Sequence, residues 1–153
     1  MKIVLGMILI GLMFSKLAYA ENHSPLGLWK TIDDVTGEPR SILEIAQDKD
    51  HHLYGKILKV FPHKGYSQKE GCQICKGTYH NQSLEGMIVM KKLIQENPES
   101  KNWDNGKITD PLSGKTYRCS LQVLQKDKLM VRGYIGLPLF GRSQQWIRVE
   151  NVG

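Results

Sequence analysis

The sequence predicts one all-β domain, a single antiparallel β-barrel of roughly eight strands. Turn-forming clusters of Asp, Asn, Gly and Pro recur along the chain, and the runs between them are rich in Val, Ile, Tyr and Leu. Several runs alternate apolar and polar residues with a period of two, and no segment has the pattern of a strongly amphipathic helix. Because strands with one apolar face have to protect their edges, we expect the sheet to close into a barrel.

Each expected strand is bounded by turn signals. In chain order, the strands are expected at residues 26–32, 40–47, 53–61, 84–94, 107–110, 115–125, 128–135 and 142–149. Two segments need comment. The Asn105-Gly106 pair is a turn signal, which is why the fifth strand is expected to begin only after it. The segment 87–96 is ambiguous, and a strand that ends in a helical turn is one interpretation of it.

Alternation is clearest in the strand 115–125. One of its faces is apolar and consists of Tyr117, Cys119, Leu121 and Val123. A short polar turn leads to the strand 128–135, so these two strands should form an antiparallel hairpin. Charged residues (Arg118, Lys128 and Arg132) occupy the opposite face. They would point into lipid if the barrel were inserted in a membrane, which argues against insertion.

The first 20 residues have the order of features found in a secretory signal peptide. Lys2 is followed by an apolar run at 3–14 and by the small-x-small sequence Ala18-Tyr19-Ala20. A membrane-spanning helix needs about 20 apolar residues, and this run is shorter. We therefore expect residues 1–20 to be a cleaved signal and residues 21–153 to be a periplasmic or secreted domain.

The charge of the chain is moderate. The 21 basic and 15 acidic residues give +6, and since Lys2 and Lys16 belong to the expected signal, the remaining domain carries +4. These charges are interspersed, and neither a basic block nor a stacked set of aromatic residues is present. Nucleic-acid binding is therefore not expected.

The two ends of the domain resemble those of the lipocalin superfamily. The first strand begins with Gly27-Leu28-Trp29, and the last strand contains Trp146-Ile147-Arg148. In lipocalins the Trp closes one end of the barrel and the late Arg packs across it, a contact worth about 0.5–2 kcal/mol. The resemblance implies structural roles for Gly27, Trp29 and Arg148.

A second resemblance covers the chain from about residue 25 to residue 148. Segments in the order and spacing seen here look like those of a bacterial exported family, domain of unknown function 2147. The similar segments are Gly27-Leu28-Trp29-Lys30-Thr31, Cys72-Gln73-Ile74-Cys75, Leu84-Glu85-Gly86-Met87, residues 110–117 and residues 132–143. This resemblance implies an envelope or secreted location and a lipocalin-like barrel, and it supplies no known reaction.

The chain has three cysteines. In an oxidising compartment, Cys72 and Cys75 are expected to form a local disulfide, and Cys119 on its apolar face is expected to be a buried thiol. One alternative for the pair is thioredoxin-like redox chemistry, which normally requires a helix N-terminus in an α/β fold. The other is zinc, held by both cysteines with two of His51, His52, His63 or His80. The loop context in an all-β chain favours the disulfide, and a bond from Cys119 to one member of the pair is a further alternative. No metal or cofactor is expected.

The residues do not indicate an enzyme. No Gly-x-Ser-x-Gly or His-Glu-x-x-His motif occurs, and the carboxylates of Asp33-Asp34 and Asp110-Pro111 have ordinary turn roles. We instead expect a small apolar or amphipathic ligand inside the barrel. Its binding residues are expected to include Tyr117, Leu121, Val131, Tyr134 and Phe140. The alternative is a barrel filled with side chains that acts as a structural or protein-interaction module; the sequence identifies no partner protein.

Overall fold

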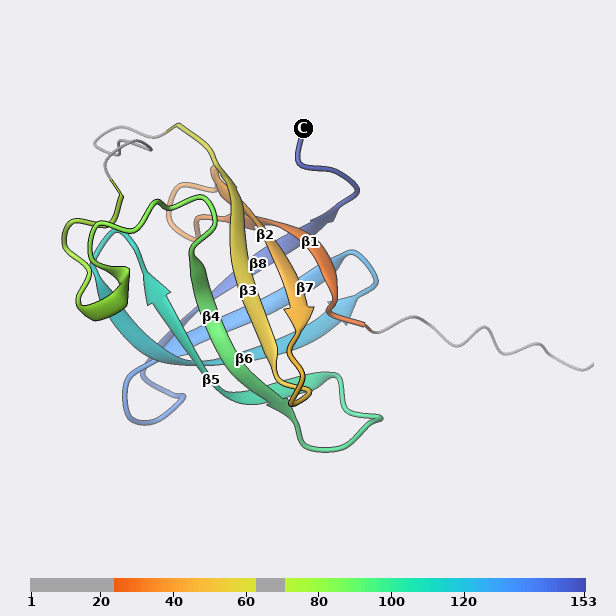
Figure 1. Cartoon of the computed structure of the whole chain (residues 1–153). Coiled ribbons are helices and arrows are strands. Elements are labelled where there is room, and N and C mark those ends of the chain that lie inside the picture. Colours follow the sequence, from red (N-terminus) through yellow and green to blue (C-terminus); the bar gives the residue numbers. More distant parts are fainter. Residues whose placement is uncertain (1–23, 63–70) are drawn as a thin grey trace, which may run out of the picture.

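The computed structural model describes residues 24–62 and 71–153 of the chain (Figure 1). The expected signal at 1–20 and His63 lie outside these residues. Eight strands are present: β1 (Gly27–Ile32), β2 (Pro39–Gln47), β3 (Leu53–Val60), β4 (Ile88–Gln95), β5 (Asn102–Asp110), β6 (Lys115–Gln125), β7 (Lys128–Tyr134) and β8 (Gly141–Val149). One turn of 3₁₀ helix, η1 (Gly77–Tyr79), follows β3. No helix in the described residues is long and apolar enough to span a membrane.

The strands form one closed antiparallel barrel. Each strand pairs with the next, and β8 pairs with β1 through a register that places Arg148 opposite Trp29. The predicted fold class is therefore confirmed, including the hairpin between β6 and β7. Alternation in β6 is also confirmed, because Cys119, Leu121 and Val123 are at most 2% exposed.

Two expectations about the middle of the chain are wrong. The segment 87–96 forms no helical turn, because β4 continues to Gln95. Asn105 and Gly106 form no chain reversal either; they lie inside β5, where Asn105 has a φ of 62° and the register with β6 shifts. A β-bulge accounts for both features. Only a glycine fits at position 106, because a Cβ there would lie 2.6 Å from the Leu93 side chain.

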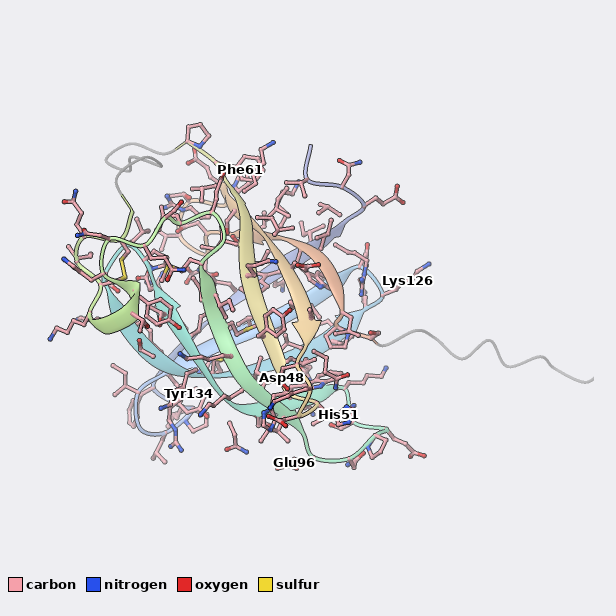
Figure 2. All side chains as sticks on the ribbon, viewed as in Figure 1. Asp48, His51, Phe61, Glu96, Lys126 and Tyr134 are labelled. Atoms are coloured by element: carbon pink, nitrogen blue, oxygen red, sulfur yellow. A yellow bond between two sulfur atoms is a disulfide. The ribbon has the colours of Figure 1, made fainter. Side chains whose placement is uncertain are left out.

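The up-and-down order of strands gives the barrel two different ends. Successive hairpins lie at alternate ends, so the connections β1–β2, β3–β4, β5–β6 and β7–β8 share one end, which we call the open end. The turns β2–β3, β4–β5 and β6–β7 share the other, which we call the closed end. Figure 2 places the labelled Lys126 of the β6–β7 turn on the side of the barrel away from Tyr134 at the end of β7.

The closed end is sealed by the residues that suggested a lipocalin. The Arg148 guanidinium lies 4.2 Å above the Trp29 ring, and Trp29 is fully buried. Arg148 also donates hydrogen bonds of 2.7–2.8 Å to the carbonyls of Lys126, Leu26 and Ser24. Gly27 leaves room for this side chain, because a Cβ there would lie 2.9 Å from Arg148 Nη1.

The cysteines adopt the expected states. Cys72 and Cys75 form a disulfide in the β3–β4 connection, which confirms that prediction. A zinc site on this pair would need both thiolates, and the disulfide consumes them. Cys119 is a free, fully buried thiol. Burial, with a smaller contribution from the Asp104 carboxylate, raises its pKa to about 12, so the thiol stays protonated.

Candidate functional site

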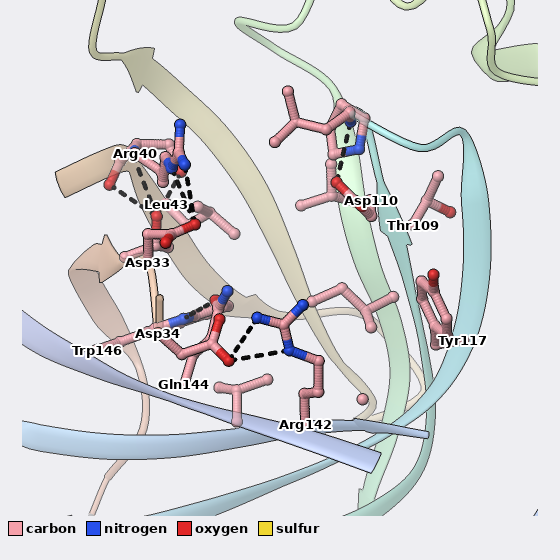
Figure 3. A pocket seen from close by; sticks show the side chains of 18 of the residues that line it. Asp33, Asp34, Arg40, Leu43, Thr109, Asp110, Tyr117, Arg142, Gln144 and Trp146 are labelled. Carbon is pink, nitrogen blue, oxygen red and sulfur yellow. Dashed lines mark hydrogen bonds and ion pairs between the residues drawn. The ribbon is translucent and has the colours of Figure 1, made fainter. Parts of the chain in front are cut away.

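A cavity of about 630 Å³ occupies the open end of the barrel (Figure 3). Inward-facing side chains from six strands form its apolar wall: Leu43, Ile57, Val89, Ile108, Val131 and Trp146. These residues share a surface because alternate positions of each strand point inward. Their depth in the barrel follows from the tilt and register of the closed sheet.

A partly buried ion pair lies at the connection between β1 and β2. Asp33 Oδ2 accepts hydrogen bonds from Arg40 Nε at 3.1 Å and Nη2 at 2.9 Å. Asp33 Oδ1 caps the turn by accepting from the backbone N–H groups of Thr36 and Val35. The bond from the Thr36 backbone N–H, with a further contribution from Arg40, holds the pKa of Asp33 well below its usual range. These bonds outweigh partial burial, which by itself would raise the pKa.

A second ion pair crosses the mouth of the cavity. Asp34 Oδ2 accepts from Arg142 Nε at 3.0 Å and from Nη2 at 2.8 Å, which joins the β1–β2 turn to β8 (Figure 3). The Arg142 side chain is 69% exposed and that of Asp34 is 25% exposed. Water therefore screens this pair, and it contributes at most about 1 kcal/mol to stability.

Uncharged polar groups complete the lining. The hydroxyls of Thr31 and Ser41 are hydrogen-bonded to each other at 2.9 Å, and the hydroxyl of Thr109 forms a bond of 2.8 Å with that of its cross-strand partner Thr116. Gln144 accepts a hydrogen bond from Trp146 Nε1 at 3.2 Å. These polar groups lie among apolar neighbours, an arrangement that is typical of small-molecule sites.

Apolar side chains are exposed around the mouth. Within the described residues, every large apolar side chain that is more than 45% exposed belongs to an open-end loop: Val35, Ile74, Leu112, Ile135, Leu137, Leu139 and Phe140. Four of the seven belong to the β7–β8 loop. Arg132 fastens that loop by donating to the carbonyls of Pro138 at 2.7 Å and Leu139 at 3.3 Å.

The structure brings together most of the residues expected to bind a ligand. Tyr117, Val131, Tyr134 and Phe140 line the cavity. Leu121 does not line it; this residue is 1% exposed and belongs to the packed core nearer the closed end. Contact between any of these residues and a ligand stays a prediction.

Sequence reasoning did not include the charged lining in the site. Asp33 and Asp34 read as turn residues, and their partners Arg40 and Arg142 are remote from each other in the chain. The available signal was the strand order, since an up-and-down barrel brings the β1–β2 turn and the start of β8 to the same end.

One other group of possible ligating side chains lies at the closed end. Asp48, Asp50 and His52, in the β2–β3 turn, have potential ligand atoms within 4.8 Å of one another. Asp48 Oδ1 already accepts from the backbone N–H groups of Asp50 and His52. These bonds, led by that of His52, lower the pKa of Asp48 and account for the cluster as a turn.

Comparisons with known proteins agree with the architecture. Residues 27–148 match the model of a family described as an uncharacterized protein conserved in bacteria (DUF2147). The solved structure of a protein from the human pathogen Helicobacter pylori, described as belonging to the lipocalin family, superposes with a TM-score of 0.69. That match covers 84% of each chain at 17% sequence identity, so it shows the fold. A search of curated proteins finds no match.

Proposed function

The chain belongs to this family of uncharacterized bacterial proteins (DUF2147), and we propose that it is an exported binding protein of the bacterial envelope. In this proposal, a small apolar or amphipathic molecule occupies the open end of the barrel. The lipocalin-like fold suggests small-molecule binding in general, and the cavity of about 630 Å³ with its apolar wall is the observation that carries the finer proposal.

The size of the cavity suits a ligand of modest length. Known ligand sites range over about 300–1,000 Å³. A chemical group of the size of a water molecule takes up about 30 Å³, so this cavity has room for roughly 20 such groups of a ligand. Apolar burial at about 25 cal/mol per Å² would drive binding, and the few polar groups would orient the ligand.

Export is proposed on two grounds. The first 20 residues have the signal-peptide pattern, and the domain contains a disulfide. Disulfides persist in the periplasm and outside the cell, where thiols are not kept reduced. The test is N-terminal sequencing of the protein from a periplasmic extract, which should begin at Glu21.

The cavity weighs against the alternative of a filled barrel. A filled barrel would place side chains where this cavity lies, between Leu43, Val131 and Trp146. A role in protein interaction remains compatible with the exposed apolar loops of the open end, and it would not require the cavity.

Two experiments test the binding proposal. Native mass spectrometry of the protein purified from its own host's envelope should show a co-purifying small molecule. Independently, the uncharged fluorescent probe N-phenyl-1-naphthylamine should bind the purified protein and be displaced by apolar compounds. A protein that binds neither probe nor cargo would refute the proposal.

Site-directed changes locate the binding. Val131→Trp fills the cavity and should weaken probe binding at least about tenfold, which corresponds to about 1.4 kcal/mol. The matched control, Leu124→Trp, adds the same ring at a position of β6 that is outside the cavity and 37% exposed, and it should leave binding unchanged. If Val131→Trp does not fold, Ile108→Phe tests the same space from β5. Equal binding by the cavity variant and its control would contradict the proposed site.

A further inference from the structure

The charges that line the cavity are nearly balanced. Three carboxylates (Asp33, Asp34 and Asp110) and two guanidiniums (Arg40 and Arg142) contribute to the lining, for a formal charge of −1. Each guanidinium is paired with one carboxylate. Asp110 forms no salt bridge with any residue of the described chain, and its oxygens accept from the β5–β6 turn. A ligand entering the cavity therefore meets no excess positive charge.

The charge of each guanidinium is already balanced by a neighbouring carboxylate. Arg40 directs Nε and Nη2 at Asp33, while its remaining nitrogen, Nη1, is buried and has no hydrogen-bond partner among the described residues. Arg142 directs Nε and Nη2 at Asp34. The low pKa of Asp33 keeps this carboxylate ionised, so Arg40 stays neutralised across the physiological pH range.

Uncharged hydrogen-bond donors remain available in the lining. The hydroxyls of Tyr117 and Tyr134 have no hydrogen-bond partner within residues 24–62 and 71–153, and both residues line the cavity. Gln144 uses its carbonyl oxygen to accept from Trp146, and its amide NH₂ group has no acceptor in the same ranges. Such donors suit an uncharged acceptor on the ligand.

We propose that the cavity selects uncharged amphiphiles, whose head group is a neutral hydrogen-bond acceptor such as an amide, ester or hydroxyl, and discriminates against anionic ones such as fatty-acid carboxylates. This inference rests on the proposed binding function and names the chemical class of its ligand. The physical reason is that a buried carboxylate requires a compensating cation, and both candidate cations are already paired. A neutral head group loses less hydration energy on burial than a carboxylate does. The tyrosine and glutamine donors can replace its hydrogen bonds to water.

The test uses ligands that share a decyl chain and differ only in the head group. Decanamide, 1-decanol, decanoic acid and decylamine compete with N-phenyl-1-naphthylamine at about pH 7.5, where the carboxylic acid is ionised and the amine is protonated in water. The amide and the alcohol should displace the probe at concentrations at least about tenfold lower than the carboxylate does. Equal or tighter binding of the carboxylate overturns the inference. Tighter binding of the amine than of the amide also overturns it, because the free charge of Asp110 would then govern selection.

Variants of the Asp34–Arg142 ion pair show whether neutralisation of the Arg142 charge causes the selectivity. Asp34→Asn releases Arg142 and should raise the affinity for decanoate, measured relative to that for decanamide, about tenfold. Glu99→Gln, which makes the same charge change in the exposed β4–β5 turn at the closed end, is the control and should alter neither. If Asp34→Asn does not fold, Arg142→Gln should lower the affinity for decanoate relative to that for decanamide. If Asp34→Asn, or Arg142→Gln in its place, folds and its affinity for decanoate relative to that for decanamide is unchanged, the inference is overturned. If the wild-type protein does not bind the probe, the proposed function itself is refuted.

Discussion

Replacement of Arg148 by alanine should destabilise the barrel while leaving the cavity intact. The Arg148 side chain lies 4.2 Å above Trp29 and ties together three segments of the closed end through the carbonyls of Ser24, Leu26 and Lys126. Alanine removes all of these contacts at once. The cavity lies at the other end of the barrel, and Arg148 is not part of its lining.

The magnitude follows from the contacts. A hydrogen bond from a charged donor contributes about 1.5–3 kcal/mol to stability when it is shielded from water. Because two of the three Arg148 bonds are exposed, the three together contribute about 2 kcal/mol. The guanidinium–indole contact adds about 1 kcal/mol, since Trp29 is fully buried. The expected decrease in the free energy of unfolding is therefore about 3 kcal/mol, or a fall in melting temperature of about 10 °C for a domain of this size.

The assay is urea denaturation followed by circular dichroism, with probe affinity measured on the same samples. Arg118→Ala is the control, because this arginine lies on the exposed outer face of β6 and its loss should change stability by less than about 0.5 kcal/mol. Arg148→Lys should recover part of the stability, since a lysine keeps the charge but cannot reach three carbonyls. A loss below about 1 kcal/mol for Arg148→Ala would refute this account of the closed end.

Three further predictions concern the loops of the open end. Phe140→Ala should weaken probe binding without lowering the melting temperature, because this side chain lines the mouth and is 70% exposed; a large thermal loss would instead identify the loop as a plug. Replacing Cys72 and Cys75 together by serine should destabilise the domain by about 2 kcal/mol in urea denaturation, as the loop they close is short, and a loss above about 4 kcal/mol would contradict a purely local role. The pKa of Asp33 is lowered in the folded protein, so its stabilising contribution is complete above the ordinary carboxyl pKa of about 4 and is lost as the pH falls below it. Asp33→Asn should therefore flatten the acid limb of the melting-temperature profile, and an unchanged limb would show that other carboxyls dominate it.

Local patterns were enough to predict the fold class. The period of two in β6 identifies its inward face, and Cys119 and Leu121 are buried as expected. The same period does not give the depth of a residue along the barrel. Tyr117 and Leu121 share a face but lie four residues apart, about 13 Å along a strand, so one lines the cavity and the other belongs to the packed core. The bulge in β5 was missed because an Asn-Gly pair carries the same local signal in a bulge and in a turn.

The sequence alone predicted the faces of the strands and most of the turns between them, and it favoured the pairing of Cys72 with Cys75, since each of these depends on residues close together in the chain. Tertiary structure decided which end of the barrel is open and which charges are neutralised. The Asp34–Arg142 pair joins residues separated by 108 positions, and it exists only because β8 closes against β1. Strand closure sets such distances by long-range register, and no local pattern encodes that register.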